Sequence, residues 1–112
     1  MANQGSLHGV TLLSAESHTQ ASAPLEPEFD CVLQETIQFT QGGFGCLRLP
    51  GVEEYPFIGW VGAGGSMVVW NEQLQIGFSY VMNAMGLSLL GDRRGIGLLN
   101  AVVDVVAHRH SK

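Results

Sequence analysis

Two apolar runs in the middle of the chain constrain its fold more than any other feature. They span Ser66–Trp70 and Leu74–Met82, and only the polar triplet Asn71–Gln73 separates them. Short runs rich in β-branched and aromatic residues that are joined by a few polar residues predict an antiparallel hairpin. Because both runs are almost continuously apolar, we expect both faces of this hairpin to be covered, although the chain supplies few other elements for that purpose.

A helix is predicted after the hairpin, over residues 92–109. Its apolar residues recur at steps of three and four, which places them on one face: Ile96, Leu99, Val102, Val103 and Val106. Asp92 favours the amino end of this helix, and the basic residues from His108 to His110 favour its carboxyl end. We expect the apolar face to dock on the hairpin, with the join sealed by Leu87, Leu89 and Leu90. The chain is therefore predicted to have an α+β fold in which a C-terminal helix packs on an antiparallel sheet.

The remainder of the chain is predicted to form one unit with these elements, over residues 1–112. Residues 1–30 are expected to contain a helix end and a loop, with Ser14 able to cap the helix and Glu16 in its first turn. Residues 31–83 are expected to be antiparallel strands, and the shorter ones are Cys31–Leu33, Thr36–Thr40 and Phe44–Leu49.

Composition excludes several classes of function. Apolar residues make up 46% of the chain, which is enough for a packed core. The formal net charge is −5, and Lys112 is the only lysine, so neither nucleic acid nor a membrane surface is an expected partner. No apolar run approaches the roughly 20 residues that span a bilayer. The first residues show neither the charged nor the apolar region of a secretory leader, so a cytoplasmic location is the default expectation.

Cysteine and histidine residues give little indication of a special site. Cys31 and Cys46 are able to close one loop, but two free and largely buried thiols are expected, and the sequence leaves their pairing open. Their spacing from the histidines does not fit a zinc site, so no metal and no cofactor is predicted. A thiol nucleophile paired with His8 or His18 has no support from spacing either.

The most informative segment for function is Gly59–Ser66, which is crowded with glycine. Glycine removes the Cβ atom, so another group must approach the backbone closely here. The segment matches neither of the glycine-rich phosphate-binding patterns, G-x-x-x-x-G-K-[ST] and G-x-G-x-x-G. A bulge that lets elements pack and a strand edge that faces a ligand are equally good interpretations of this pattern.

A family resemblance favours the second interpretation. Trp60–Gly62, followed by Ala63–Ser66, resembles the W-x-G variant of the K-T-G triplet on the active-site strand of serine β-lactamases and penicillin-binding proteins. Other segments on both sides of it resemble family landmarks and occur in the family's order: Leu12–Ser17, Gly42–Gly45, Phe78–Asn83 and Gly91–Arg94. The chain is thus similar, over nearly its whole length, to the C-terminal portion of the β-lactamase-related, class C-like esterase family. The resemblance implies a partial β-lactamase/transpeptidase-like fold.

The resemblance also implies roles for individual residues. The backbone N–H of Ala63 would be one of two oxyanion donors, and Gly62 would let the strand pass close to the substrate. Trp60, Val61 and Gly64 would complete the substrate-binding wall. Trp60 stands where the family has lysine or histidine, which favours ester or small amide substrates over β-lactams, although plain core packing of the ring is the alternative. On this interpretation, residues 62–66 lie on an exposed strand edge.

The catalytic motifs of the same family are missing from the sequence. The nucleophile and base need S-x-x-K, but Lys112 follows Arg109 at that spacing. Y-x-N is also absent, and Tyr80 and Asn83 are interpreted as structural. Because both motifs precede the matched region in the family, the chain is expected to begin downstream of them and to be inactive alone.

Three functions remain open at this point. The first is the C-terminal segment of a serine hydrolase that acts through an acyl-serine, with a small ester or amide substrate only if the upstream part is present. The second is a non-catalytic pseudoenzyme remnant or interaction module, which could self-associate through an uncovered sheet. The third is an unrelated small binding domain built from a sheet and a helix.

Overall fold

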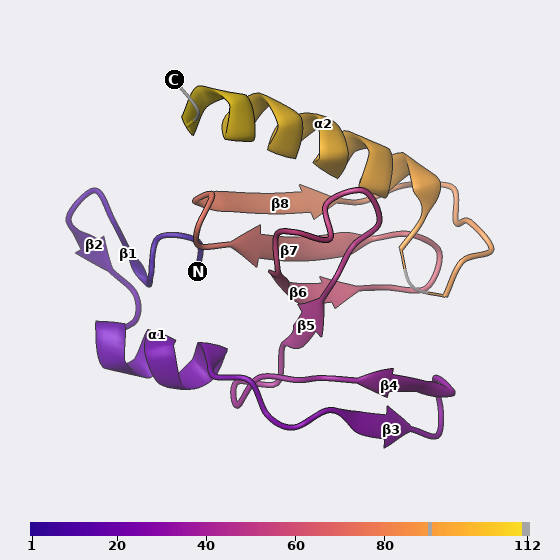
Figure 1. The fold of residues 1–112 in the computed structure, drawn as a ribbon, viewed down its shortest axis with the longest axis horizontal. Helices are drawn as coiled ribbons and strands as arrows, with labels where there is room; N and C mark the ends of the chain where they lie inside the picture. Colours follow the sequence, from indigo (N-terminus) through magenta and orange to yellow (C-terminus); the bar gives the residue numbers. More distant parts are fainter. Residues whose placement is uncertain (90, 111–112) are drawn as a thin grey trace.

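A four-stranded antiparallel sheet with one long helix along it organises the chain (Figure 1). The computed structural model describes residues 1–89 and 91–110. The sheet has the order β5-β6-β7-β8, and its strands are β5 (Gly45–Leu47), β6 (Phe57–Val61), β7 (Met67–Asn71) and β8 (Ile76–Tyr80). Helix α2 (Arg93–His110) follows the last strand and packs on one face. The prediction of an α+β fold with a C-terminal helix on an antiparallel sheet is confirmed.

The predicted hairpin is present as β7 and β8, which pair from Met67↔Tyr80 to Asn71↔Ile76. The buried Asn71 side chain fixes its turn. The Asn71 Oδ1 atom accepts a hydrogen bond from the Leu74 N–H at 2.7 Å, and Nδ2 donates to the Pro56 carbonyl at 2.7 Å. One side chain therefore ties the hairpin turn to the start of β6.

The family resemblance places Trp60–Gly62 on a strand, and the structure shows that this strand, β6, is separate from the hairpin strand that follows it. It pairs with β7 from Ile58↔Trp70 to Val61↔Met67, so Gly59, Trp60 and Val61 lie inside a strand of their own. Glycine has low strand propensity, and Gly59 lies in the middle of this otherwise continuously apolar segment. Pairing with β7 overrides this local preference.

The core lies between α2 and one face of the sheet. On the helix, Leu99 is 0% and Val103 2% exposed, and they face sheet residues such as Phe57 and Val69. Val102 is 37% exposed, so the prediction that it belongs to the buried face is wrong. The expected seal is also wrong, because Leu87 and Leu89 are exposed, while Leu90 lies outside the described residues.

The opposite face of the sheet is covered only in part. The Trp70 ring is buried there and meets Phe44 edge-on, with ring centroids 4.9 Å apart. Val68 on the same strand is 57% exposed. The expectation that both faces of the hairpin are covered is therefore wrong at Val68, because no described residue covers this part of the sheet.

The first helix begins as predicted. Helix α1 (Ala15–Ser22) has Ser14 as its N-cap, and the Ser14 hydroxyl accepts from the Ser17 N–H at 3.1 Å. A small hairpin of β1 (Ser6–Leu7) and β2 (Val10–Thr11) precedes this helix.

A second hairpin, β3 (Glu28–Asp30) with β4 (Glu35–Ile37), follows α1 and lies at the end of the molecule opposite α2 (Figure 1). The predicted strand Cys31–Leu33 is instead the turn of this hairpin. The Asp30 carboxylate accepts from the N–H groups of Val32 and Leu33 at 2.8 and 2.9 Å, which makes an Asx turn. A side chain that bonds to the following backbone outweighs a short β-branched pattern.

The two cysteines are unpaired. Cys46 is half-buried, and burial raises the pKa of its thiol. Cys31 is exposed, so the expectation of two largely buried thiols is wrong for this residue. Within residues 1–89 and 91–110, no helix has the length and apolar character needed to cross a membrane.

The packing of α2 predicts that substitutions at two adjacent leucines of this helix differ sharply in their effect on stability. Leu99→Ala should lower the free energy of unfolding by about 2–5 kcal/mol, because it leaves a cavity in the core. Leu98, which is 53% exposed, is the matched control, and Leu98→Ala should change stability by roughly 0.5 kcal/mol or less. Urea unfolding of the two variants measures this, and equal losses would show that α2 packs through a different face.

Candidate functional site

The glycine-rich segment after β6 forms a tight turn into β7. The Gly62 N–H donates to the Ser66 carbonyl at 2.7 Å, and the Gly65 N–H donates back to the Gly62 carbonyl at 3.1 Å. Gly64 and Gly65 have φ angles of +89° and +119°, and residues with a side chain rarely adopt this backbone conformation. The prediction of an exposed strand edge over residues 62–66 is therefore wrong, because the chain reverses direction here.

A loop before α2 covers one side of this turn. The Gly64 N–H donates to the Ser88 carbonyl at 3.0 Å, and the Gly86 N–H donates to the Gly64 carbonyl at 2.7 Å. A Cβ atom at Gly65 would collide with the Asp92 carboxylate. Gly64 and Gly65 are consequently buried, and the turn is fixed from within and from one side.

Ala63 occupies the uncovered part of the turn. It is exposed, while the glycines that follow it are buried. Within the described part of the chain, the structure records no hydrogen-bond acceptor for the Ala63 N–H. A backbone donor on a fixed turn with no partner of its own is able to bond to an external oxygen atom.

Asp92 and Arg94 hold the covering loop against the start of α2. The Asp92 Oδ1 atom accepts from the N–H groups of Arg94 and Gly95 at 2.9 and 3.1 Å, and Oδ2 accepts from the Arg94 Nε at 2.8 Å. The same Arg94 donates through Nη2 to the Ala84 carbonyl at 2.9 Å. The side-chain hydrogen bond from Arg94, followed by that from the Gly95 backbone, lowers the pKa of Asp92 below its ordinary value.

Trp60 both packs and borders a cavity. Its half-buried ring stacks on Phe39 with a centroid distance of 5.5 Å and an angle of 21° between the planes. On β5, a Cβ atom at Gly45 would lie only 2.8 Å from the Trp60 ring, so glycine is what lets the two strands come together. A cavity of about 500 Å³ adjoins Trp60 and Val61 and extends to Ile96 of α2. The packing and ligand-facing interpretations of Trp60 are thus compatible.

Three solved protein chains resemble this one, and a carboxylesterase and a penicillin-binding protein homologue are among them. A family VIII carboxylesterase superposes with a TM-score of 0.82 and 27% identity over 92% of this chain and 28% of its own. A penicillin-binding protein homologue from Caulobacter crescentus superposes with a TM-score of 0.77 and 29% identity, with the same coverage of both chains. No family model and no curated protein matches the sequence.

The chain matches the C-terminal portion of the β-lactamase/transpeptidase-like family. It spans 28% of the length of each of the two solved structures.

The β-lactamase-like fold gathers the predicted site residues in two groups. Trp60 and Val61 border the cavity beside β6, whereas Gly62, Ala63 and Gly64 form the adjoining turn. Their part in binding or catalysis stays a prediction.

The sequence analysis misses the residues that support this turn, namely Asp92, Arg94 and the loop from Ala84 to Ser88. A signal for them is present, because Gly91–Arg94 is one of the landmarks that resemble the family. That resemblance indicates where α2 opens, but not that its first residues contact the glycine turn. Tyr80 is half-buried against the core, in keeping with the structural role expected of it.

The Asp92 contacts predict a pH-dependent contribution to stability. Because the native pKa of Asp92 is lowered, this contribution is complete above the unfolded value of about 4 and is lost as the pH falls through the native pKa. The gap in melting temperature between the wild type and Asp92→Asn should therefore be largest at neutral pH and should shrink below about pH 4. Thermal unfolding across this range measures the gap.

Arg94→Leu is the companion variant for this experiment. It removes the largest cause of the pKa shift while leaving Asp92 in place. The melting temperature of this variant should therefore fall less steeply with acid than that of the wild type. A gap between wild type and Asp92→Asn that is equal at acidic and neutral pH would contradict the interpretation.

Proposed function

We propose that this chain forms one wall of the active site of a serine hydrolase that acts through an acyl-serine. In this proposal the Ala63 N–H is one of the two oxyanion donors. The observation that carries the proposal is the exposed Ala63, whose N–H has no recorded acceptor among the described residues, on a turn held by hydrogen bonds on either side of it. A donor that is already oriented stabilises developing negative charge without the cost of reorganisation.

The substrate side of the wall is proposed to be Trp60 and Val61, with Gly62 and Gly64 allowing close approach. The cavity beside Trp60 is lined mainly by uncharged groups, although Glu35 and Arg48 also border it. The Arg48 guanidinium donates to the Glu53 carbonyl at 2.8 Å, which engages part of its donor capacity. With an indole at position 60 instead of a cation, a neutral ester or small amide suits the site better than a β-lactam with its carboxylate.

The nucleophile and its base must come from polypeptide other than these 112 residues, since the sequence contains no S-x-x-K. The first experiment is therefore to sequence the gene or transcript upstream of Met1. An open frame with S-x-x-K and Y-x-N supports the hydrolase, and a frame without them rules out an enzyme encoded by this gene.

Ala63→Pro in the longer polypeptide tests the oxyanion role, because proline removes the N–H. Loss of one oxyanion donor should lower kcat for p-nitrophenyl acetate by about 100- to 1000-fold. Ala63→Ser is the matched control, since it keeps the N–H and should retain most of the activity. Equal activity of the proline and serine variants would show that this N–H does not act on the substrate.

The 112-residue chain alone should hydrolyse neither p-nitrophenyl esters nor a chromogenic cephalosporin. This expectation follows from the missing nucleophile–base pair. Turnover that a serine-directed covalent inhibitor abolishes would contradict it.

A second candidate function, a non-catalytic interaction module, is favoured by the incompletely covered sheet face. Val68 on β7 is 57% exposed and Val81 after β8 is 80% exposed, while β8 pairs only with β7 among the described strands. An apolar face next to an open strand edge favours association. Sedimentation should show self-association that Val68→Thr weakens, and a compact monomer would count against this candidate.

A further inference from the structure

Strand β8 forms an edge of the four-stranded sheet that the described residues leave open. It pairs with β7 and with no other described strand (Figure 1). The strand at the opposite edge, β5, is bonded by a preceding segment of the chain. There the Cys46 N–H donates to the Gln38 carbonyl at 2.8 Å, and Gly45 bridges to Phe39. Of the two edges, β8 is therefore the one that the described chain leaves without a neighbour.

The register of the sheet shows which backbone groups of β8 point outward. The Gly62 N–H donates to the Ser66 carbonyl at 2.7 Å, so every second residue counted from Ser66 bonds to β6. The residues between these bond to β8 instead, at every second position counted back from Tyr80. The remaining positions of β8, Gly77 and Ser79, are exposed. Their N–H and C=O groups consequently point away from β7.

Helix α2 carries an apolar flank on the same side of the sheet. A Cβ atom at Gly95 would lie 2.9 Å from the Tyr80 ring, so the helix begins over β8. Further along, Asn100 lies against Gly51 in the β5–β6 loop, towards the opposite edge. Because an α-helix has about 3.6 residues per turn, the side chains at steps of three and four from Leu98 lie on the flank away from Asn100. They are Leu98, Val102 and Val105, which are 53%, 37% and 56% exposed.

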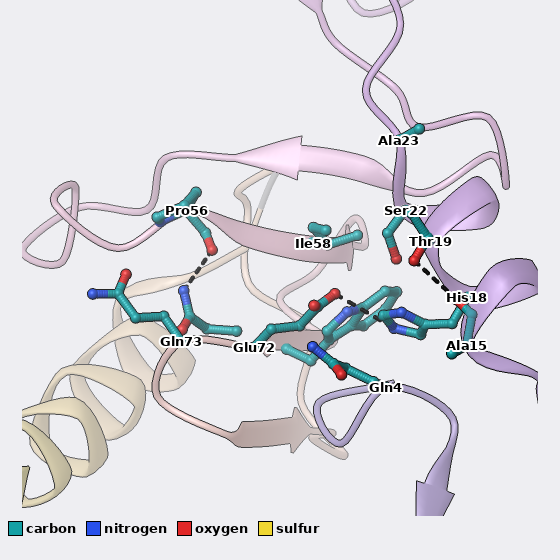
Figure 2. A pocket seen from close by; sticks show the side chains of 12 residues that line it. Gln4, Ala15, His18, Thr19, Ser22, Ala23, Pro56, Ile58, Glu72 and Gln73 are labelled. Carbon is teal, nitrogen blue, oxygen red and sulfur yellow. Dashed lines mark hydrogen bonds and ion pairs between the residues drawn. The ribbon is translucent and has the colours of Figure 1, made fainter. Parts of the chain in front are cut away.

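The chain around this edge is uncharged. Residues 73–91 contain none of the acidic, lysine, arginine or histidine side chains. Glu72, the acid that precedes this stretch, points towards α1, where its Oε1 lies 3.4 Å from His18 Nε2 (Figure 2). Edge strands are usually protected from pairing by charged residues, proline or a bulge. Strand β8 has no charge and no proline, and its register with β7 is unbroken, so nothing in it opposes a further strand.

A second copy of the chain fits this surface. An edge strand is complementary to itself about a twofold axis, because the two copies then run antiparallel and each outward N–H meets a C=O group of the other. The formal net charge of −5 makes two copies repel each other over much of their surface. An uncharged stretch is where they can approach without that repulsion. A basic partner, which the net charge attracts, finds no carboxylate on this stretch.

We propose that two copies of this chain pair through β8 about a twofold axis, so that their two sheets join into one. The N–H groups of Gly77 and Ser79 bond to the other copy, and the flanks of the two α2 helices cover the join with Leu98, Val102 and Val105. This inference rests on the second candidate function, the interaction module, and names its partner. It requires no activity at Ala63.

Sedimentation equilibrium of the 112-residue chain over a wide range of concentrations provides the test, and the wild type should form a dimer. Ser79→Pro removes one outward donor from each copy, and proline is tolerated on an edge strand where its missing N–H would face outward. The dissociation constant should rise by about 10- to 30-fold, as expected for two lost hydrogen bonds. Thermal unfolding at concentrations where both proteins are monomeric checks that the variant is folded.

Val105→Asp tests the helix flank in the same experiment. It should raise the dissociation constant by about 10-fold or more, because the dimer would bury an unpaired carboxylate. Val32→Asp is the matched control, since it makes the same change in net charge. Val32 is 85% exposed and lies in the β3–β4 turn, at the end of the molecule opposite α2 (Figure 1). This control should leave the dissociation constant unchanged, and equal effects of the two aspartates would overturn the proposed contact.

The inference is overturned unless both Ser79→Pro and Val105→Asp weaken the dimer. A dimer that resists both variants but is weakened by Val68→Thr overturns this inference alone, because the interaction module then associates through its sheet face. A monomer at every concentration overturns the inference and the interaction-module candidate together. Oligomers that keep growing with concentration overturn the twofold pairing, which closes at two copies.

Discussion

The packing of α2 against one face of the sheet is the contact on which the rest of this structure depends. Leu99 and Val103 are almost completely buried there against β6 and β7. The same docking places Asp92, at the start of the helix, beside Gly65 in the turn between β6 and β7. The hydrophobic core and the geometry of the candidate site are therefore coupled, because a shift of the helix would move the carboxylate that borders the turn.

This coupling explains how a glycine-rich segment can be rigid. Glycine loses more conformational freedom on folding than other residues, so a run of glycines tends to be mobile unless it is tied down. Here the turn is closed by its own hydrogen bonds and is bonded to the loop at Gly86 and Ser88. Arg94 holds that loop through the Ala84 carbonyl. The outcome is a backbone held by hydrogen bonds with a single exposed residue, Ala63, and the proposed oxyanion role of its N–H depends on this geometry.

The two faces of the sheet differ in character. One is a closed apolar core, while the other combines aromatic contacts with polar groups that the described residues leave unpaired. Trp70 shows this mixture, because its ring packs against Phe44 while its indole N–H has no partner. Val68 on this second face is 57% exposed. The chain spans 28% of the length of each of the two solved structures.

The sequence by itself determined the features that depend on local order. Apolar runs around a polar turn gave the β7–β8 hairpin, a serine before an acidic first turn gave the start of α1, and three- and four-residue spacing gave the buried face of α2. The W-x-G segment and its neighbouring landmarks were enough to predict the family. These signals are local because each depends on residues within a few positions of one another.

Only the tertiary structure decided the rest. Strand β6 exists because β7 pairs with it, despite Gly59, and Cys31–Leu33 is a turn because Asp30 bonds to its backbone. The approach of Asp92 to Gly65 and the gathering of His18 with Trp70 join residues far apart in the chain, and no local pattern encodes such contacts. Long-range packing sets them, so the sequence could name candidate residues without showing which ones meet.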